Sequence, residues 1–304
     1  MSESLEIFFY LFCVAGGYGL GSKKALPRSF WEKLIKALVW VVYPALLFHG
    51  ITEGYTKKTL VSHFFLPFAG FGIMLLGYSF SHIWFKLQKR DYPAHVKATL
   101  GSLSTMGNYI FLPYPIAKIL WGEAAGTAVL LTSLGCDLGV WTLGVSFLQK
   151  KGGLPLKKLL NPPLVALLCA LIIVYFEISL SSTFLEVKKG IGYLGLLTVP
   201  IAMLFLGENL GGVKLNLRGT KRFFSVIAIQ LFFIPLTVFL LMPWFSVAIE
   251  LQRVLFLISS MPPAIASVLL AELYEGDAKL AAEGVFITHL LALVTVPVFL
   301  FFCA

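Results

Sequence analysis

Charged residues are scarce in this 304-residue chain, and that scarcity limits what kind of protein it is. Asp, Glu, Lys and Arg make up only 13% of the residues, whereas hydrophobic residues make up 58%. A soluble domain carries about 25% charged residues, so the composition excludes a soluble protein and indicates an integral membrane protein. The apolar segments are too long for transmembrane strands, which alternate over about ten residues. We therefore predict an all-α polytopic membrane protein.

Cysteine is also rare. The chain has four cysteines, all in apolar segments and without the spacing of a metal site: Cys13, Cys136, Cys169 and Cys303. We expect buried, unreactive thiols, no metal ion and no bound cofactor.

Acidic residues are outnumbered by basic ones, 15 against 24, which gives a formal net charge of +9. A basic chain can bind nucleic acid, but here the basic residues gather in short loops between apolar segments. Eighteen of the 24 lie in the loops that are cytoplasmic if the N-terminus is outside. By the positive-inside rule we expect both termini on the non-cytoplasmic side of the plasma (inner) membrane, surrounding lipids, and no nucleic-acid partner.

Ten apolar segments reach the roughly 20 residues that a membrane helix needs. They lie near residues 5–21, 33–51, 60–85, 95–120, 123–148, 162–180, 188–208, 221–242, 250–273 and 278–302. Acidic residues precede the first segment and basic residues follow it, the reverse of a signal peptide, so we expect it to stay as a helix. Its glycine-rich stretch GGYGLG (16–21) is expected to permit close helix packing rather than to bind a nucleotide.

The longest connection, at 149–161, divides the chain into two halves of five segments, 1–150 and 161–304. Because five is odd, the second half starts on the opposite side of the membrane, and a repeat between the halves has to be inverted. A shift of 154 residues lays WGEAAGTAV (121–129) on EGDAKLAAE (275–283), and GNY (107–109) on MPP (261–263). Interrupted segments at corresponding positions of two repeats point to a transporter site.

Two of the ten segments contain residues that break helices: MGNYIFLPYP (106–115) and SMPPAIAS (260–267). Proline removes a backbone N–H and clashes with the preceding turn, and backbone groups freed in hydrocarbon need a partner. Two breaks that meet near the midplane would present two half-helix N-termini, whose partial positive charge suits an anion such as a carboxylate. The predicted substrate-binding residues are Gly107, Asn108, Tyr109, Pro113, Met261, Pro262, Pro263 and Ala264.

Asn108 has two interpretations. Its amide can donate to a carboxylate without burying a charge, or it can satisfy the broken backbone around it. The matching Pro262–Pro263 break favours the ligand, because a lone proline kink needs no partner. Asn161, which precedes Pro162, is expected only to cap the start of a helix.

Ionisable residues inside apolar segments are functional candidates. Asp137 lies near the middle of the fifth segment, roughly 20 Å from one end at about 1.5 Å per residue. It is expected to carry a proton, to bind a cation or to hydrogen-bond the break in the fourth segment. The other proton or cation candidates are Glu283, which alternatively reaches a cytoplasmic vestibule, and His289, which alternatively packs in the bundle.

Two long stretches resemble a known family. GNYIFLPYPIAKILWGEAAGTAVLLTSLGCDLGVWTLGV (107–145) resembles the fourth and fifth helices of the auxin efflux carrier family, which includes plant auxin exporters and bacterial malate- or malonate-permease-like proteins. MPPAIASVLLAELYEGDAKLAAEGVFITHLLALVTVP (261–297) resembles its ninth and tenth helices. Shorter stretches also match in position: YPALLF (43–48), NPPLVALL (161–168) and VPIAMLFLGENL (199–210).

The resemblance implies ten helices in two inverted five-helix repeats, similar to the bile-acid/sodium symporter fold. Residues 1–55 and 161–210 would form a scaffold, often a homodimer through helices 2 and 7. Residues 60–150 and 220–304 would form a mobile core. Helices 4 and 9 would be broken and would cross, with substrate bound at the crossing and moved in the manner of an elevator.

The family's crossover asparagine corresponds to Asn108, and its crossover proline to Pro262 or Pro263. The chain departs from the family pattern at Tyr109–Ile110, where bacterial relatives are richer in glycine. It departs again at Cys136–Asp137, where paired asparagines are usual.

The sequence thus predicts a secondary transporter or facilitated carrier of small organic anions, carboxylates in particular, and not an enzyme. Coupling to H⁺ or Na⁺ would use Asp137. Two alternatives stay open. A membrane-embedded enzyme would use Asp137 and Glu283, although no catalytic motif surrounds either residue. A non-transporting receptor would keep the same fold.

Overall fold

The computed structural model describes residues 3–88, 92–149, 160–212, 221–274 and 276–303. In these ranges the chain forms helices joined by short loops, and Gly107 and Pro263 form an isolated β-bridge. The all-α membrane fold expected from the composition is confirmed.

The helices of the first part of the chain are α1 (Glu3–Ser22), α2 (Arg28–Ala37), α3 (Tyr43–Gly54), α4 (Lys57–Ser62), α5 (Leu66–Leu87), α6 (Ala94–Thr105), α7 (Pro113–Trp121) and α8 (Glu123–Gly139). Those of the second part are α10 (Pro162–Tyr175), α11 (Ser182–Leu196), α12 (Thr198–Gly212), α13 (Phe224–Ala228), α14 (Ile234–Leu241), α15 (Ile249–Ser259), α16 (Ala266–Leu273) and α17 (Ala278–Cys303). Short π or 3₁₀ turns continue some of them: η1 (Leu38–Val42), η2 (Val140–Gly144), η3 (Val145–Phe147), η5 (Ile229–Phe233) and η6 (Met242–Trp244).

Seven helical stretches of the described chain are long and apolar enough to cross a membrane: Leu5–Ser22, Arg28–Gly54, Lys57–Leu87, Glu123–Phe147, Ser182–Gly212, Lys221–Trp244 and Ala278–Phe301. The three other expected segments are shorter in the structure. Helix α10 has 14 residues, and the segments near 95–120 and 250–273 are each divided by a break into two helices, α6 with α7 and α15 with α16. The count of ten crossings and the inverted repeat stay predictions.

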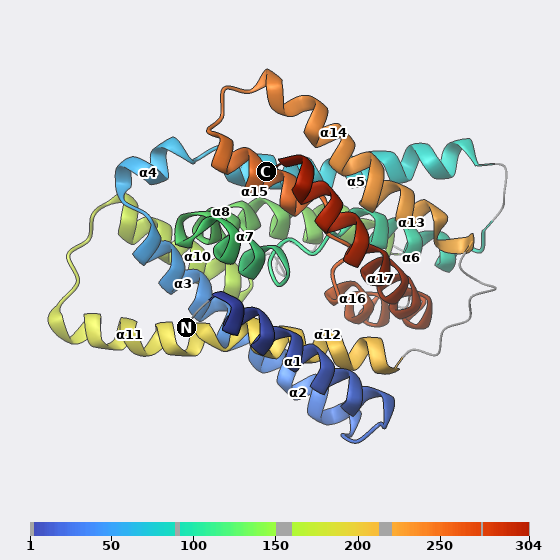
Figure 1. Cartoon of the computed structure of the whole chain (residues 1–304), viewed down its shortest axis with the longest axis horizontal. Helices are drawn as coiled ribbons and strands as arrows, with labels where there is room; N and C mark the ends of the chain where they lie inside the picture. The colour runs from blue at the N-terminus through green and yellow to red at the C-terminus, as the bar shows by residue number, and fades with distance from the viewer. Residues whose placement is uncertain (1–2, 89–91, 150–159, 213–220, 275, 304) are drawn as a thin grey trace.

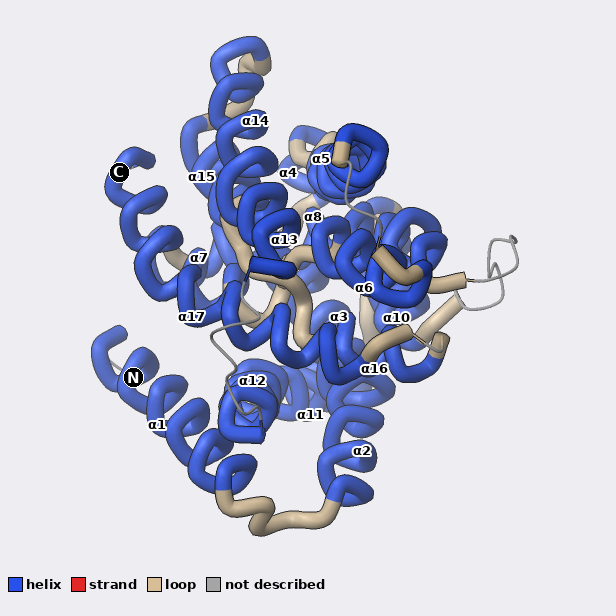
Figure 2. Tube along the Cα trace, turned by 90° about the vertical axis from the view of Figure 1, so that its right-hand side faces the viewer, coloured by secondary structure: helices blue, strands red, loops and turns tan. Residues whose placement is uncertain are grey.

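Helices α1, α2, α11 and α12 lie together along one side of the molecule, and α5 and α14 lie on the opposite side (Figures 1 and 2). Helices α6, α7 and α8 run between these two sides. Many large apolar side chains on the outer helices are exposed, for example Phe12, Phe68 and Leu293. Such a surface fits a lipid environment, where apolar side chains need no burial.

Close packing of α1 on α12 explains the glycine-rich stretch of α1. A Cβ on Gly17 would lie 2.0 Å from the carbonyl oxygen of Leu204, and a Cβ on Gly207 would lie 2.0 Å from that of Val14. The two backbones therefore touch in a way that only glycine permits. The prediction that GGYGLG serves helix packing is confirmed.

Asn161 also behaves as expected. Its side-chain oxygen accepts a hydrogen bond from Leu164 N at 2.9 Å, and Pro162 occupies the first position of α10. The residue is an N-cap, because it satisfies one of the N–H groups that a helix start leaves free.

Two expectations were wrong. The seventh segment was expected to begin near residue 188, but α11 begins six residues earlier, at Ser182, and Lys188 is buried. Lys188 Nζ lies 2.8 Å from a carboxylate oxygen of Glu53 and donates to Thr52 O at 3.3 Å. The cysteines are not uniformly buried either. Cys136 is buried, but Cys13 is only half-buried and Cys169 is exposed on α10. Outward positions of a membrane helix face lipid, so an apolar segment does not imply burial in protein.

Candidate functional site

The two predicted breaks lie against each other and pair through their backbones. Asn108 N donates to Pro262 O at 2.8 Å, and Ala264 N donates to Met106 O at 2.8 Å. Between these bonds, Gly107 and Pro263 form the antiparallel bridge. Helices 4 and 9 of the sequence prediction are therefore broken and cross, and the backbone groups freed by one break are largely satisfied by the other.

Local sequence explains where each break begins and ends. Helix α6 stops at Thr105, and α7 starts at Pro113, which is buried. On the other side, α15 stops at Ser259, just before Pro262–Pro263. A proline disfavours the helical conformation of the residue before it, and it provides no N–H. Met261, Pro262 and Pro263 are all buried, so the crossing lies inside the protein and not against lipid.

Of the two interpretations of Asn108, the structure shows the one in which it satisfies the broken backbone, and the ligand interpretation stays a prediction. Its Oδ1 accepts a hydrogen bond from Phe111 N at 3.2 Å, so it satisfies the broken backbone. Its Nδ2 has no hydrogen-bond partner among the described residues, and the residue is only 2% exposed, so water has little access to it. An amide nitrogen carries two donors, and leaving them buried without an acceptor is costly. The structure thus leaves a donor group available at the crossing.

Backbone N–H groups that follow the two breaks have hydrogen-bond acceptors, unlike Nδ2 of Asn108. Tyr114 N bonds to Ile110 O at 3.0 Å, and Ser267 N bonds to Ala264 O at 3.0 Å. The turns that lead into α7 and α16 therefore satisfy much of the helix starts. The partial positive charge of each helix start persists, so the crossing keeps an anion-favouring field next to the free amide.

Gln230 is a residue of the crossing that the sequence interpretation missed. It lies in the π turn η5, is 2% exposed, and donates from Nε2 to Leu103 O at 3.1 Å. In an unbroken helix Leu103 O would accept from residue 107, so Gln230 replaces a backbone donor that the break removes. A Cβ on Gly107 would lie 3.3 Å from its Oε1. The signal was present, because a lone amide in an apolar segment is unusual.

Asp137 connects the crossing to α8. Its Oδ1 accepts a hydrogen bond from the hydroxyl of Tyr109, which belongs to the first break. Its Oδ2 is buried without a partner in the described chain, and the side chain is 8% exposed. One turn earlier on α8, Ser133 Oγ accepts from the hydroxyl of Tyr43 at 3.4 Å. Of the three roles expected for Asp137, the hydrogen bond to the break is confirmed.

Phe111 joins the crossing to the helices on the side of α1 and α12. Its ring lies 5.7 Å from that of Tyr43 on α3, in an edge-to-face arrangement. It also packs against the small apolar cluster of Leu38, Val42 and Ala202. Phe111 therefore meets these neighbours through apolar contacts.

The other two ionisable candidates have different surroundings. Glu283 forms an ion pair with Arg222 and is 13% exposed at its side chain. His289 donates from Nδ1 to Val285 O at 2.8 Å, one turn earlier in its own helix, while Nε2 is buried and unpartnered in the described part. Within the described residues neither makes a hydrogen bond or ion pair with the breaks, whereas Asp137 does. Within the described ranges, His, Cys, Asp and Glu form no cluster of three suited to a metal ion.

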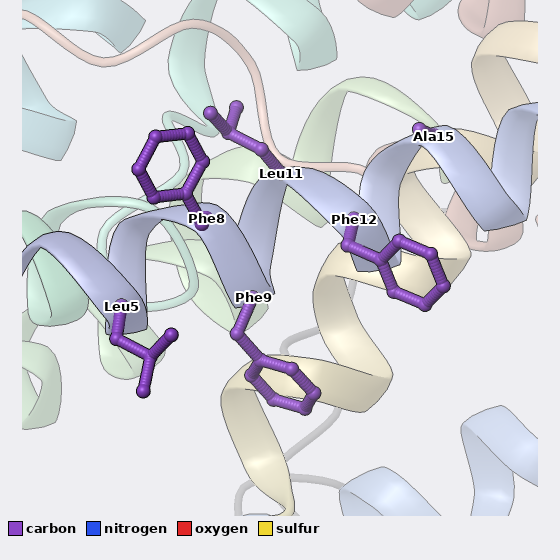
Figure 3. A pocket seen from close by; sticks show the side chains of 6 residues that line it. All are labelled: Leu5, Phe8, Phe9, Leu11, Phe12 and Ala15. Carbon is purple, nitrogen blue, oxygen red and sulfur yellow. The ribbon is translucent and has the colours of Figure 1, made fainter. Parts of the chain in front are cut away.

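A large hollow on the outer face of α1 is not part of this site. It has a volume of about 830 Å³ and is lined only by apolar side chains: Leu5, Phe8, Phe9, Leu11, Phe12 and Ala15. Figure 3 shows these side chains projecting from α1. Such a lining offers no donor to an anion, and an apolar face of this kind suits lipid chains.

Two comparisons with known proteins bear on the function. A family model described as membrane transport protein matches residues 4–154 and 146–300. The chain is also 30% identical, over 312 aligned positions, to an uncharacterized transporter of Methanocaldococcus jannaschii, and the alignment covers 95% of each chain.

Proposed function

Because the chain belongs to the membrane transport protein family, we propose that it is a secondary transporter or facilitated carrier of small organic anions, carboxylates in particular. A transport role follows from the family and from the relative that is named a transporter. The resemblance to malate- and malonate-permease-like proteins makes these two dicarboxylates the first substrates to test.

The observation that carries the proposal is the free amide of Asn108. Its Nδ2 is buried at the crossing and lacks an acceptor in the described chain, while its Oδ1 is used by Phe111 N. A substrate carboxylate would provide that acceptor, and a hydrogen bond to a charged group is stronger than a neutral one. The start of α7 adds a favourable field for negative charge. In the proposed site Asn108 therefore donates, while the paired backbones around Gly107, Pro263 and Ala264 hold it in place.

The proposed movement is an elevator-type alternating access. Residues 1–55 and 161–210 would stay fixed as a scaffold, while residues 60–150 and 220–304 move with the crossing. The scaffold would form the homodimer contact through the second and seventh predicted segments (33–51 and 188–208). The apolar contact of Phe111 with Tyr43 supports this division, because apolar surfaces can slide past each other. The movement would also have to break the 3.4 Å hydrogen bond from Tyr43 to Ser133. Asp137 would carry the coupling proton or sodium ion, since its Oδ2 has no hydrogen-bond partner in the described chain.

The test separates the two roles of Asn108. Asn108→Asp keeps an oxygen that caps Phe111 N but replaces the NH₂ donor by a carboxylate oxygen, which repels a carboxylate substrate. We expect flux of malate or malonate into proteoliposomes to fall at least tenfold, since about 1.4 kcal/mol is lost with one such bond. Folded protein should still insert in the membrane.

Asn161→Asp is the matched control. Asn161 caps Leu164 N with the same spacing of three residues, but at the start of α10 and away from the crossing. Its flux should equal that of the wild type. Unchanged flux in Asn108→Asp would remove Asn108 from the substrate site.

The same flux measurement distinguishes the alternatives. A membrane-embedded enzyme would convert substrate without moving it, and a receptor would bind it without flux. The enzyme alternative needs two cooperating carboxylates, but Asp137 is bonded to Tyr109 and Glu283 to Arg222.

A further inference from the structure

A second hollow lies at the ends of α5 and α13, away from the crossing. It has a volume of about 310 Å³ and is lined by Trp84, Gln88, Tyr92, Lys221, Phe224 and Ser225. The two helices approach each other here (Figure 1). The centroids of the Trp84 and Phe224 rings are 5.7 Å apart. Unlike the hollow on α1, this one combines polar, basic and aromatic side chains.

Three polar atoms around this hollow have no hydrogen-bond partner in the described chain. They are Trp84 Nε1, Gln88 Oε1 and Ser225 Oγ, and each atom is buried. Ser225 as a whole is only 4% exposed. Buried polar groups almost always find partners, so three atoms around one hollow that have no partner in the described chain favour a bound ligand there.

The donors and acceptors that line the hollow indicate which ligand would fit it. Trp84 Nε1 and Ser225 Oγ provide N–H and O–H donors, and Lys221 adds a positive charge. Donors together with a cation suit a phosphate group. Gln88 Oε1 is instead an acceptor, so the same ligand should also carry an N–H or O–H donor. None of the six lining residues is acidic.

The position of the hollow indicates where the phosphate comes from. It lies where two membrane-crossing stretches, Lys57–Leu87 and Lys221–Trp244, end and begin. Tryptophan and tyrosine are enriched at the membrane–water boundary, and basic pockets between membrane helices bind phospholipid headgroups. Phe224, which lines the hollow, is 62% exposed and offers an apolar surface to an acyl chain.

We propose that this hollow binds the headgroup of a membrane phospholipid, with the phosphate held by Trp84, Ser225 and Lys221. Gln88 accepts a hydrogen bond from the headgroup's ammonium or hydroxyl group. Phosphatidylethanolamine and phosphatidylglycerol are therefore preferred to phosphatidylcholine, because a trimethylammonium group has no N–H to donate.

The experiment measures the thermal unfolding midpoint and the bound-lipid mass of delipidated protein in detergent. Palmitoyl-oleoyl phosphatidylethanolamine, phosphatidylglycerol, phosphatidylcholine, a diacylglycerol and inorganic phosphate are added separately. A ligand that binds the native state raises the midpoint. We expect the first two lipids to raise it at the lowest concentrations, with one tightly held lipid per chain, and diacylglycerol to have little effect.

Three variants remove single groups from the hollow: Ser225→Ala, Trp84→Phe and Lys221→Gln. Each should weaken the lipid response about tenfold or more, as expected for a hydrogen bond to a charged group. Ser225→Ala is the most informative, because without lipid it removes an unsatisfied hydroxyl and should not lower the midpoint. Lys86→Gln and Trp244→Phe are matched controls, since both residues are exposed and neither lines the hollow.

Equal lipid responses in the wild type and all three variants would overturn the proposal. A response to inorganic phosphate as strong as that to phospholipid would replace the lipid by a free phosphate compound. A preference for phosphatidylcholine would contradict the role of Gln88. The proposed transport site is tested independently, because Asn108→Asp should leave the lipid response unchanged.

Discussion

Asp137 and Glu283 are both carboxylates in apolar segments, but they have different partners in the structure. Glu283 is balanced by the guanidinium of Arg222. In the described chain Asp137 forms no ion pair; its Oδ1 accepts a hydrogen bond from Tyr109 and its Oδ2 has no partner. A buried carboxylate without a counterion is expensive unless it takes up a proton or a cation, which makes Asp137 the better candidate for ion coupling.

Replacing Asp137 by asparagine tests this assignment. Asparagine keeps an oxygen that accepts from Tyr109 but cannot take up a proton or neutralise a sodium ion. In proteoliposomes we expect the dependence of flux on a pH or sodium gradient to disappear, while KM for the substrate changes by less than about threefold, or roughly 0.7 kcal/mol.

Glu283→Gln is the control at the residue scale. It leaves Arg222 without its counterion, so we expect the free energy of unfolding to fall. Because the pair is partly exposed, the loss should lie between the roughly 0–1 kcal/mol of an exposed pair and the roughly 3–5 kcal/mol of a buried pair. Its gradient dependence should remain that of the wild type. An Asp137→Asn protein with unchanged gradient dependence would assign Asp137 a structural role.

Among the elements, α1 and α12 are held together by close backbone contact, and this contact has a direct test. Gly17→Ala places a methyl group 2.0 Å from Leu204 O, so the helices have to separate. We expect a loss of about 1–3 kcal/mol, as for other overpacked positions, seen as a lower thermal unfolding midpoint in detergent.

Gly19→Ala in the same helix should have the opposite effect. A Cβ on Gly19 meets no atom within 4 Å, and alanine favours the helix over glycine by about 0.5–1 kcal/mol. If both variants shift the midpoint in the same direction, then close packing is not what requires Gly17.

The broken segments show how an element can be interrupted in hydrocarbon without a large penalty. Each break supplies one donor and one acceptor to the other, through Asn108 N to Pro262 O and Ala264 N to Met106 O. Gln230 then occupies Leu103 O. The crossing is thus stabilised by these hydrogen bonds, and in the proposed site a substrate would use the Asn108 amide.

At the scale of the whole molecule, the proposed scaffold and core also touch through an exposed ion pair. Arg28 at the start of α2 pairs with Glu272 near the end of α16. An elevator movement would change this distance, because the two residues lie in different parts. Glu53 and Lys188, on α3 and α11, would both belong to the scaffold and should keep theirs.

Cross-linking tests this difference. In a background in which the four native cysteines are replaced by alanine, Arg28→Cys with Glu272→Cys is joined by a short reducible bifunctional maleimide. We expect flux to stop on cross-linking and to return on reduction. The pair Glu53→Cys with Lys188→Cys, joined in the same way, should keep its flux. Flux that continues through a fully cross-linked Arg28–Glu272 pair would contradict the elevator movement.

Much of the fold follows from properties that act within a few residues along the chain. Low charge and long apolar runs predicted the all-α membrane protein, prolines predicted the breaks at 106–115 and 260–267, and Asn161 before Pro162 predicted the N-cap of α10. These predictions succeeded because hydropathy, a missing N–H and a capping oxygen act locally. The start of α11 was missed because a buried lysine is tolerable only with Glu53 beside it.

The partners of each polar group were decided only by the tertiary structure. The sequence predicted that Asn108 matters, but not that its oxygen is used by Phe111 and its nitrogen left over. Nor did it predict that Gln230 would reach a carbonyl 127 residues earlier in the chain. A hydrogen bond needs two groups within about 3 Å, and only the packing of distant helices brings such groups together.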